Sequence, residues 1–257
     1  MKYLNGVNYK DCGGKVCKSK SSGDFKIVKY NDAHNVEIQF INTGYETSAR
    51  LDHVKSGNVK DLYSPSVYSV GIVGIKYPPS VNSRNTKEYD LWHSMLQRCY
   101  STTLKKKRPT YEGCKCSDNF KSYEYFYEWC NKQIGFGVAD FELDKDLLMK
   151  GNKVYSENIC VFIPKEINSL LTKSTASRGK YPIGVYWSKR DKAFVAMVCK
   201  NKGKQEYLGH FKTEIEAFDA YKTAKESFIK EQAEKWKGKI GERAYEALMN
   251  YTVEITD

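Results

Sequence analysis

The sequence has no long uninterrupted apolar run. No uninterrupted apolar stretch approaches the roughly 18 residues that a membrane-spanning helix requires, so we expect a protein with no membrane segment. The opening residues, MKYLNGVNYKDCGG, lack the apolar core of a signal peptide. We therefore expect a cytoplasmic protein rather than a secreted one.

Paired cysteines are also missing. The chain has eight cysteines but no Cys-x-x-Cys motif, and without a secretory signal we expect them to be reduced thiols. Cys114 and Cys116 could join Cys99 or Cys130 at a zinc ion, because four thiolates suit tetrahedral zinc. Since the paired spacing of zinc fingers is absent, we favour buried free thiols over a structural zinc site.

Positive charge, by contrast, is in excess. The formal net charge is +11, and a content of 40% hydrophobic and 14% aromatic residues supports folded cores. Residues 173–243 contain 17 Lys and Arg against 9 Asp and Glu, a surplus of eight positive charges. A surplus concentrated in one region favours a polyanionic partner, most simply nucleic acid, over the plainer alternative of solubilising lysines.

Residues 1–80 are rich in turns and β-branched side chains, and we interpret them as one small antiparallel β domain. The alternation over residues 25–30 and 36–40 predicts a hairpin, and residues 47–54 are expected to form a third strand. Strands this short, with turns this frequent, predict a small barrel. No motif in this region selects a peptide ligand or a nucleic-acid ligand.

A polar, proline-led segment, residues 78–88, is interpreted as a linker to a second domain over residues 86–175. A helix is expected over residues 89–100, followed by a basic loop at 105–109. Residues 120–134 are expected to form an aromatic helix. Because aromatic side chains bury the most area, we take its aromatic stripe as part of a core.

A third domain is expected over residues 180–257, with strands at 184–187, 193–199 and 207–211. The turn between the last two strands has Gly203 at its tip. Thr213 precedes Glu216 by three residues, which predicts a capping box at the start of a helix. The apolar face of this helix is then Ala217, Ala220, Tyr221, Ala224 and Phe228.

Beyond this helix, further helices are expected up to residue 251, broken near Gly238 and Gly241, with Ala244 and Leu248 facing inward. Residues 253–255 are expected to add a strand at the end. The Lys and Glu runs in this part are interpreted as a solvated face.

If the helix covers one face of the three-stranded sheet, the other face is open. Strand alternation then places on or around this face Tyr186, Ser188, Met197, Cys199, Gln205 and Tyr207, flanked by Lys189, Arg190, Lys192, Lys200, Lys202 and Lys204.

This region resembles the APETALA2-type DNA-binding domain of plant ethylene-response factors, which has related copies in phage and mobile-element proteins. The resemblance covers about fifty residues, in the order Gly184-Val185, Phe194-x-Ala196-x-Val198, Tyr207-Leu208-Gly209-x-Phe211 and Glu216-Ala217. It implies that the sheet lies in the major groove of DNA. The base-reading arginines of that family fall on Tyr186, Ser188, Cys199 and Gln205, with Arg190 as the nearest guanidinium, so the same base readout is not implied.

Residues 141–168 are expected to form a strand, a long turn, a strand and a helix. Alternation brings Asp144 and Asp146 to one face of the first strand, and Asn168 lies one turn into the helix that follows Pro164. Such oxygen ligands suit one divalent ion, Mg²⁺ or Mn²⁺.

This segment resembles the ββα-metal fold of HNH nucleases, especially phage homing endonucleases. The resemblance implies Asp144 and Asn168 as metal ligands and Lys145 at the position of the general base, with Asn152 or Asn158 pinning the loop.

The departure from that family is that no histidine occurs between His93 and His210, and histidine is the usual general base. Three outcomes are open: Lys145 acts as base, Asp146 or a metal-bound water does so, or the site is inactive. A structural alternative has both aspartates capping a turn and pairing with lysines.

We therefore predict an α+β protein with an N-terminal small β-barrel, a central HNH-like ββα-metal unit and a C-terminal three-stranded sheet plus helix. The predicted function is that of a phage or mobile-element protein acting on double-stranded DNA in a bacterial host cell. It is either a metal-dependent homing endonuclease or a protein without catalysis. The second alternative is a DNA-binding regulator, or a phage factor that blocks a host defence by occupying DNA or a host protein. A host protein is a further partner that we consider, and a third alternative is that the N-terminal barrel is a protein-interaction module that dominates the function.

Overall fold

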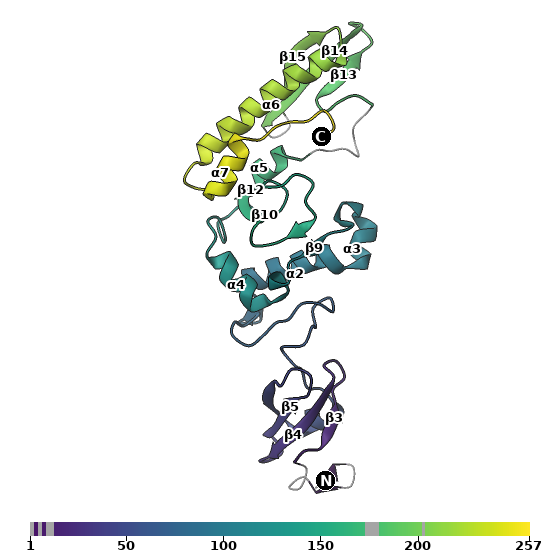
Figure 1. Ribbon diagram of the computed structural model, residues 1–257, viewed down its shortest axis with the longest axis vertical. Helices are drawn as coiled ribbons and strands as arrows, with labels where there is room; N and C mark the ends of the chain where they lie inside the picture. The colour runs from purple at the N-terminus through teal and green to yellow at the C-terminus, as the bar shows by residue number, and fades with distance from the viewer. Residues whose placement is uncertain (1–2, 5–6, 9–12, 173–179, 202–203) are drawn as a thin grey trace. The chain divides into compact units, whose positions relative to one another are not determined.

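The computed structural model describes residues 3–4, 7–8, 13–172, 180–201 and 204–257 (Figure 1). The chain is a mixture of helices and several small sheets, and it divides into two compact units, residues 1–130 and residues 131–257. This division lies inside the range 86–175 that the sequence suggested as one domain. Within the described part of the chain, no helix is both long and apolar enough to cross a bilayer.

The first unit opens with two-residue strands β1 (Tyr3–Leu4) and β2 (Val7–Asn8), followed by a four-stranded antiparallel sheet. Its strands, in order, are β3 (Val16–Lys18), β4 (Asp24–Tyr30), β5 (Val36–Phe40) and β6 (Glu46–Ala49). The predicted β4–β5 hairpin is confirmed, because Phe25 pairs with Phe40 and Tyr30 with Val36. Alternate residues of both strands are buried in one core.

The expectation of a closed barrel is wrong for the residues that the structure describes. In this sheet β3 pairs with β4 alone and β6 with β5 alone, so the sheet has two edges. The predicted strand over 47–54 is also shorter than expected, because helix α1 (Leu51–Ser56) follows β6. Leu51 and Val54, three residues apart, both reach the core, which helical spacing allows and strand alternation does not.

The expected linker contains a short hairpin of β7 (Ser80–Val81) and β8 (Arg84–Asn85). Helix α2 (Lys87–Tyr100) begins directly after it, where the Thr86 side chain accepts a hydrogen bond from the Tyr89 N–H. The basic segment expected as a loop is largely helical, as α3 (Thr102–Lys107). The Ser101 side chain caps α3 by accepting a hydrogen bond from the Leu104 N–H. The prediction of a loop rested on the lysine run and did not use this N-cap serine.

The first unit continues with η2 (Pro109–Tyr111), β9 (Lys115–Cys116), η3 (Asn119–Lys121) and the aromatic helix α4 (Tyr123–Asn131). The expectation that its aromatic stripe belongs to a core is confirmed. Phe120, Tyr123 and Phe126 are fully buried, as is Trp92 of α2. Trp92 Nε1 donates to the Phe120 carbonyl at 2.8 Å, so its one polar atom is satisfied in the core.

The second unit begins with the expected strand–turn–strand–helix arrangement. Strand β10 (Phe141–Asp144) pairs antiparallel with β12 (Val161–Pro164), and the short strand β11 (Val154–Tyr155) lies between them in the chain. Helix α5 (Lys165–Leu170) follows directly.

The expected three-stranded sheet and its helix follow. The strands are β13 (Val185–Ser188), β14 (Ala193–Asn201) and β15 (Lys204–Phe211), all antiparallel. Helix α6 (Glu214–Trp236) starts with the predicted capping box of Thr213 and Glu216, and α7 (Glu242–Met249) follows. Figure 1 shows α6 lying along the sheet, with α7 beside its far end.

The expected strand at 253–255 is wrong. Two side chains of α6 form hydrogen bonds with the backbone N–H and carbonyl of Val253, which in a sheet would bond to a neighbouring strand. The Val253 N–H donates to Glu226 Oε1 at 2.7 Å, and its carbonyl accepts from Lys222 Nζ at 2.6 Å. The segment is thereby held in an irregular conformation, with the Val253 side chain buried.

Helix α6 serves two cores. Its first half contributes Ala217, Phe218 and Tyr221 to the core under the sheet β13–β15. Its second half contributes Ile229 and Ala233 to a core built with β12, α5 and α7. One continuous helix of 23 residues therefore joins the sheet to the β10–β12–α5 segment.

Candidate functional site

One face of the sheet β13–β15 is turned away from α6, and we call it the open face. Tyr186 pairs across the sheet with Val195, and Val195 pairs with His210, so these three side chains form one row. Tyr186 is 48% exposed, whereas Val195, which lies between Tyr186 and His210, is only 1% exposed. Tyr207, opposite Met197 in the next row, is 53% exposed.

A β-bulge brings Tyr207 and His210 onto the same face. The pairing passes from Ala196–Gly209 to Met197–Tyr207, so Leu208 is the extra residue of β15. Gly209 has φ +140°, a conformation that L side chains rarely adopt. Because regular alternation would place residues 207 and 210 on opposite faces, only the bulge makes them neighbours.

These neighbours are linked by a hydrogen-bonded chain. Tyr207 Oη lies 2.8 Å from His210 Nδ1, and His210 Nε2 lies 3.2 Å from Asp191 Oδ2. Ser188 Oγ donates to the same Asp191 oxygen at 2.6 Å. The open face therefore carries a connected series of tyrosine, histidine and aspartate that is anchored to β13.

Asp191 is held by a second partner as well. Arg190 donates to it twice, Nε to Oδ1 at 2.9 Å and Nη2 to Oδ2 at 3.2 Å. These bonds from Arg190, together with the bond from Ser188, keep the pKa of Asp191 well below its usual range. Asp191 is therefore a carboxylate at neutral pH, ready to accept a bond from the imidazole.

The predicted DNA-contact residues have different surroundings. Lys189, Arg190 and Lys192 are exposed in the turn between β13 and β14, beside the open face. Lys200 is half-buried and pairs with Glu206 at 2.8 Å. Gln205 is exposed opposite Cys199, Lys204 lies in β15 opposite Asn201, and Lys202 lies outside the described residues.

Asp191 and His210 are the two open-face residues that the sequence did not reveal. The glycine before His210 was the available signal, because an isolated glycine inside a strand often marks a bulge. Asp191 lies in a turn, where strand phase assigns no face.

In the predicted metal site, Asp144 is buried and caps a turn. Its Oδ2 accepts from the backbone N–H groups of Asp146, at 2.7 Å, and Leu147, at 2.6 Å. Burial raises the pKa of Asp144 and outweighs the effect of these two bonds. The capping contact is the one that the structural alternative anticipated.

Lys145 is engaged by its neighbours. Its Nζ donates to both carboxylate oxygens of Asp146 at 2.7 Å and to the Asn152 carbonyl at 2.7 Å. Asn152 in turn donates to the carbonyls of Lys145 and Val154, and its Oδ1 accepts from the Val154 N–H. Asn152 therefore ties the loop together, while Asn158 lies exposed in a later turn.

Asn168 donates to Glu142 Oε2 at 2.7 Å. Glu142 and Asp144 point to the same face of β10, but Asp144 is bonded to the turn and Asn168 to Glu142. Within the described ranges, three or more His, Cys, Asp or Glu side chains do not converge into a group that could hold a metal ion.

The four cysteines considered for zinc, Cys99, Cys114, Cys116 and Cys130, are all buried and are not in disulfides. Cys116 Sγ lies 3.5 Å from the Tyr100 hydroxyl, and burial raises the pKa of its thiol.

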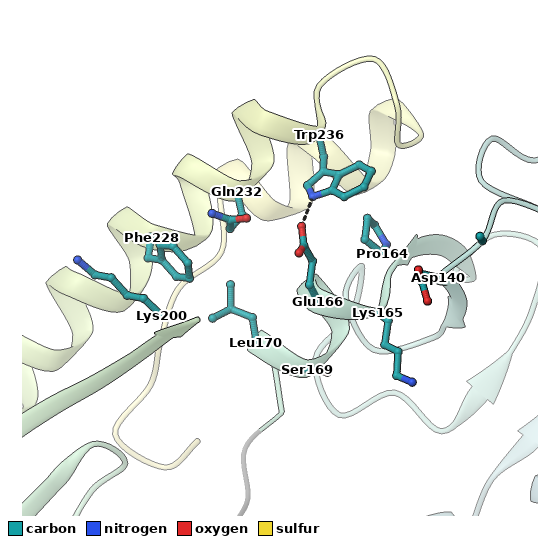
Figure 2. A pocket seen from close by; sticks show the side chains of 11 residues that line it. Asp140, Pro164, Lys165, Glu166, Ser169, Leu170, Lys200, Phe228, Gln232 and Trp236 are labelled. Carbon is teal, nitrogen blue, oxygen red and sulfur yellow. Dashed lines mark hydrogen bonds between the residues drawn. The ribbon is translucent and has the colours of Figure 1, made fainter. Parts of the chain in front are cut away.

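A groove of about 770 Å³ opens between α5 and α6 (Figure 2). Phe228, Leu170 and Trp236 line it, and Trp236 Nε1 donates to Glu166 Oε1 at 2.7 Å. Glu166 also pairs with Lys235 at 3.0 Å, so the carboxylate at the groove is already engaged by the chain itself. Of the described residues assigned to sites from the sequence, Lys200 alone lines this groove.

Comparison of the chain with known protein families, with curated proteins and with solved structures found no match.

Proposed function

We propose that this chain binds double-stranded DNA through the open face of the sheet β13–β15. The observation that carries the proposal is the grouping of exposed polar and aromatic side chains on one face, with cations at its edge. Tyr186, Gln205, Tyr207 and His210 are exposed on this face, and α6 covers the opposite one. A surface of this kind offers hydrogen-bonding groups to base edges and sugars.

The cations supply the second part of the proposal. Lys189, Arg190 and Lys192 stand in one exposed turn at the end of the sheet, where they would contact phosphates. The whole chain carries a net charge of +11, which favours association with a polyanion. The resemblance to APETALA2-type domains, in which a three-stranded sheet lies in the major groove, favours duplex DNA over single strands.

The test is a salt titration of binding to a labelled mixed-sequence duplex, followed by fluorescence anisotropy. Substituting Lys189→Ala or Lys192→Ala should weaken binding and reduce the slope of log K against log salt by about one for each phosphate that the variant no longer neutralises. Lys230→Ala, on the exposed side of α6, is the matched control and should leave the slope unchanged. No binding at low salt would refute the proposal, as would equally weakened binding in all three variants.

We further propose, as the second candidate function, metal-dependent cleavage of the bound duplex by an HNH-like homing endonuclease of phage or mobile-element type. The observation that favours it is the order β10, β12, α5, with Asn152 tying the intervening loop. Asp144 and Asn168 would hold Mg²⁺ or Mn²⁺, and Lys145 or Asp146 would assist the attacking water. The contacts of Asp144 and Lys145 must then rearrange, because their polar atoms are engaged within the turn.

A plasmid-nicking assay with Mg²⁺ or Mn²⁺ separates the enzyme from its alternative, a protein without catalysis that binds DNA or blocks a host defence. Nicking that is abolished in Asp144→Ala and in Lys145→Ala supports the nuclease. Tight binding with no metal-dependent nicking in the wild-type protein supports the binding protein.

A further inference from the structure

We propose that Tyr207 is a nucleophile that forms a covalent phosphotyrosyl bond with DNA, with His210 as its general base and Asp191 as the residue that positions His210. This inference rests on the proposed DNA binding and adds a reaction to it. The reaction is a transesterification that uses no metal ion, and it is independent of the predicted site at Asp144.

The geometry is that of an activated nucleophile. The Tyr207 hydroxyl lies 2.8 Å from His210 Nδ1, and the opposite ring nitrogen, Nε2, lies 3.2 Å from Asp191 Oδ2. A nucleophile within hydrogen-bond reach of a base, which is itself oriented by a third group, is the arrangement that enzymes use to activate weak nucleophiles. The acceptor Asp191 selects the imidazole tautomer with hydrogen on Nε2, which leaves Nδ1 free to take the tyrosine proton.

Several features hold the three residues in place. The bulge at Leu208 and the backbone of Gly209 set Tyr207 and His210 side by side. Their rings meet edge to face, with centroids 5.4 Å apart and planes at 68°. The carboxylate of Asp191 is fixed by Ser188 and by two bonds from Arg190. The Tyr207 side chain is thus preorganised, and the residue is 53% exposed, which leaves it open to a ligand as large as DNA.

The proposed step balances without a further reactant. Tyr207 Oη forms a bond to the phosphorus of a DNA phosphodiester as its proton passes to His210 Nδ1. The bond from phosphorus to one sugar oxygen breaks, and that oxygen leaves with the electron pair and takes the proton back from the imidazolium. One phosphodiester is replaced by another, so the reaction is reversible. Arg190, which bonds to Asp191, and Lys192, in the same exposed turn, are the cations that would stabilise the charge on phosphorus.

The experiment uses the full chain and duplexes selected for binding from a random pool, labelled on one strand and incubated in EDTA. Denaturing electrophoresis then separates DNA that migrates with the protein from free DNA. The wild-type chain should retain the label, and comparing 5′-labelled with 3′-labelled strands identifies which sugar oxygen leaves. The yield is normalised to bound DNA, measured by anisotropy for each variant.

Tyr207→Phe should abolish the adduct, and His210→Gln should slow its formation by about 10²–10⁴-fold. Tyr125→Phe is the matched control, because Tyr125 is also exposed, at 39%, and belongs to α4 rather than to the strands and turn that carry the three residues. Asp191→Asn should slow the reaction about 10²-fold or more and shift its pH profile, whereas a purely structural role would lower the yield without moving the profile.

The outcomes separate the two proposals. Wild-type protein that binds DNA and yields no adduct overturns the covalent step and leaves DNA binding standing. An adduct that persists in Tyr207→Phe also overturns the assignment. Absence of DNA binding overturns both proposals.

Discussion

Substitution of Gly184 by alanine tests how tightly α6 packs on the sheet. Gly184 immediately precedes β13, and its carbonyl accepts from the Met197 N–H at 2.9 Å. Its φ is +78°, in the left-handed region that favours glycine. A Cβ at this position would overlap the ring of Tyr221, 2.5 Å from Cγ and closer still to Cδ2 and Cε2.

Two costs contribute to the expected drop in stability. The left-handed backbone costs an alanine about 1–2 kcal/mol. Displacing the buried Tyr221 ring adds about 1–3 kcal/mol, the usual range for overpacking a core. Gly184→Ala should therefore lower the free energy of unfolding by about 2–5 kcal/mol, summing these two ranges.

Gly238→Ala isolates the backbone cost. Gly238 follows α6 and has φ +73°, but a Cβ there would meet no atom within 4 Å. The free energy of unfolding of this variant should fall only by the backbone contribution of about 1–2 kcal/mol. The difference between the two variants then measures the steric clash with Tyr221.

Urea unfolding supplies the two free energies, and native-state hydrogen exchange locates the effect. In Gly184→Ala, faster exchange should be concentrated in the amides of β13–β15 and the first half of α6. Equal destabilisation by the two variants would refute the close packing of α6 on residue 184. Faster exchange confined to distant elements would refute it as well.

Three further predictions concern titration and reactivity. Burial raises the pKa of Asp144 above its ordinary value of 3.8. The free energy of unfolding should therefore fall as the pH rises from 3.8 through the pKa of Asp144 in the folded chain. Asp144→Asn should remove this fall in urea unfolding measured between about pH 3 and about pH 7. Burial lowers the pKa of Lys225 from 10.5 to about 8, so stability should rise by up to ~3 kcal/mol as pH increases across that interval, and Lys225→Met should abolish the rise. Iodoacetamide should modify the exposed Cys199 before the buried Cys160, because burial raises the pKa of the Cys160 thiol to about 12. Equal labelling of the two cysteines in peptide mass spectra would contradict this.

The elements that could be predicted from the sequence are those with local signals. The hairpin of β4 and β5 follows from alternation around a polar turn, and the start of α6 follows from Thr213 and Glu216. The strand–turn–strand–helix order of residues 141–170 likewise follows from alternation and from Pro164.

The features that could not be predicted depend on contacts between distant residues. Whether the N-terminal strands close or stay open depends on edge pairing, which alternation within one strand does not encode. Residues 253–255 are apolar at alternate positions, but side chains of α6 bond the backbone of Val253.

The open face could be predicted only in part. Strand phase anticipates the exposure of Tyr186 and Tyr207, since both lie in well-patterned strands. It does not reveal the link to His210, because a single bulged residue reverses the phase of everything after it. In the same way, the pairing of Asn168 with Glu142 depends on how α5 sits on β10, which residue spacing does not determine.

The long helix α6 also limits how the chain can be dissected. A fragment starting at residue 180 keeps the sheet, α6 and α7 but discards β12 and α5, so Ile229 and Ala233 lose the part of their core that β12 and α5 supply. A fragment that ends before α6 leaves the apolar side chains of β12 and α5 exposed, because α6 no longer covers them. Expression trials of a minimal piece for testing the proposed DNA binding should therefore retain residues 131–257 intact, since shorter pieces expose an apolar helix flank and favour aggregation.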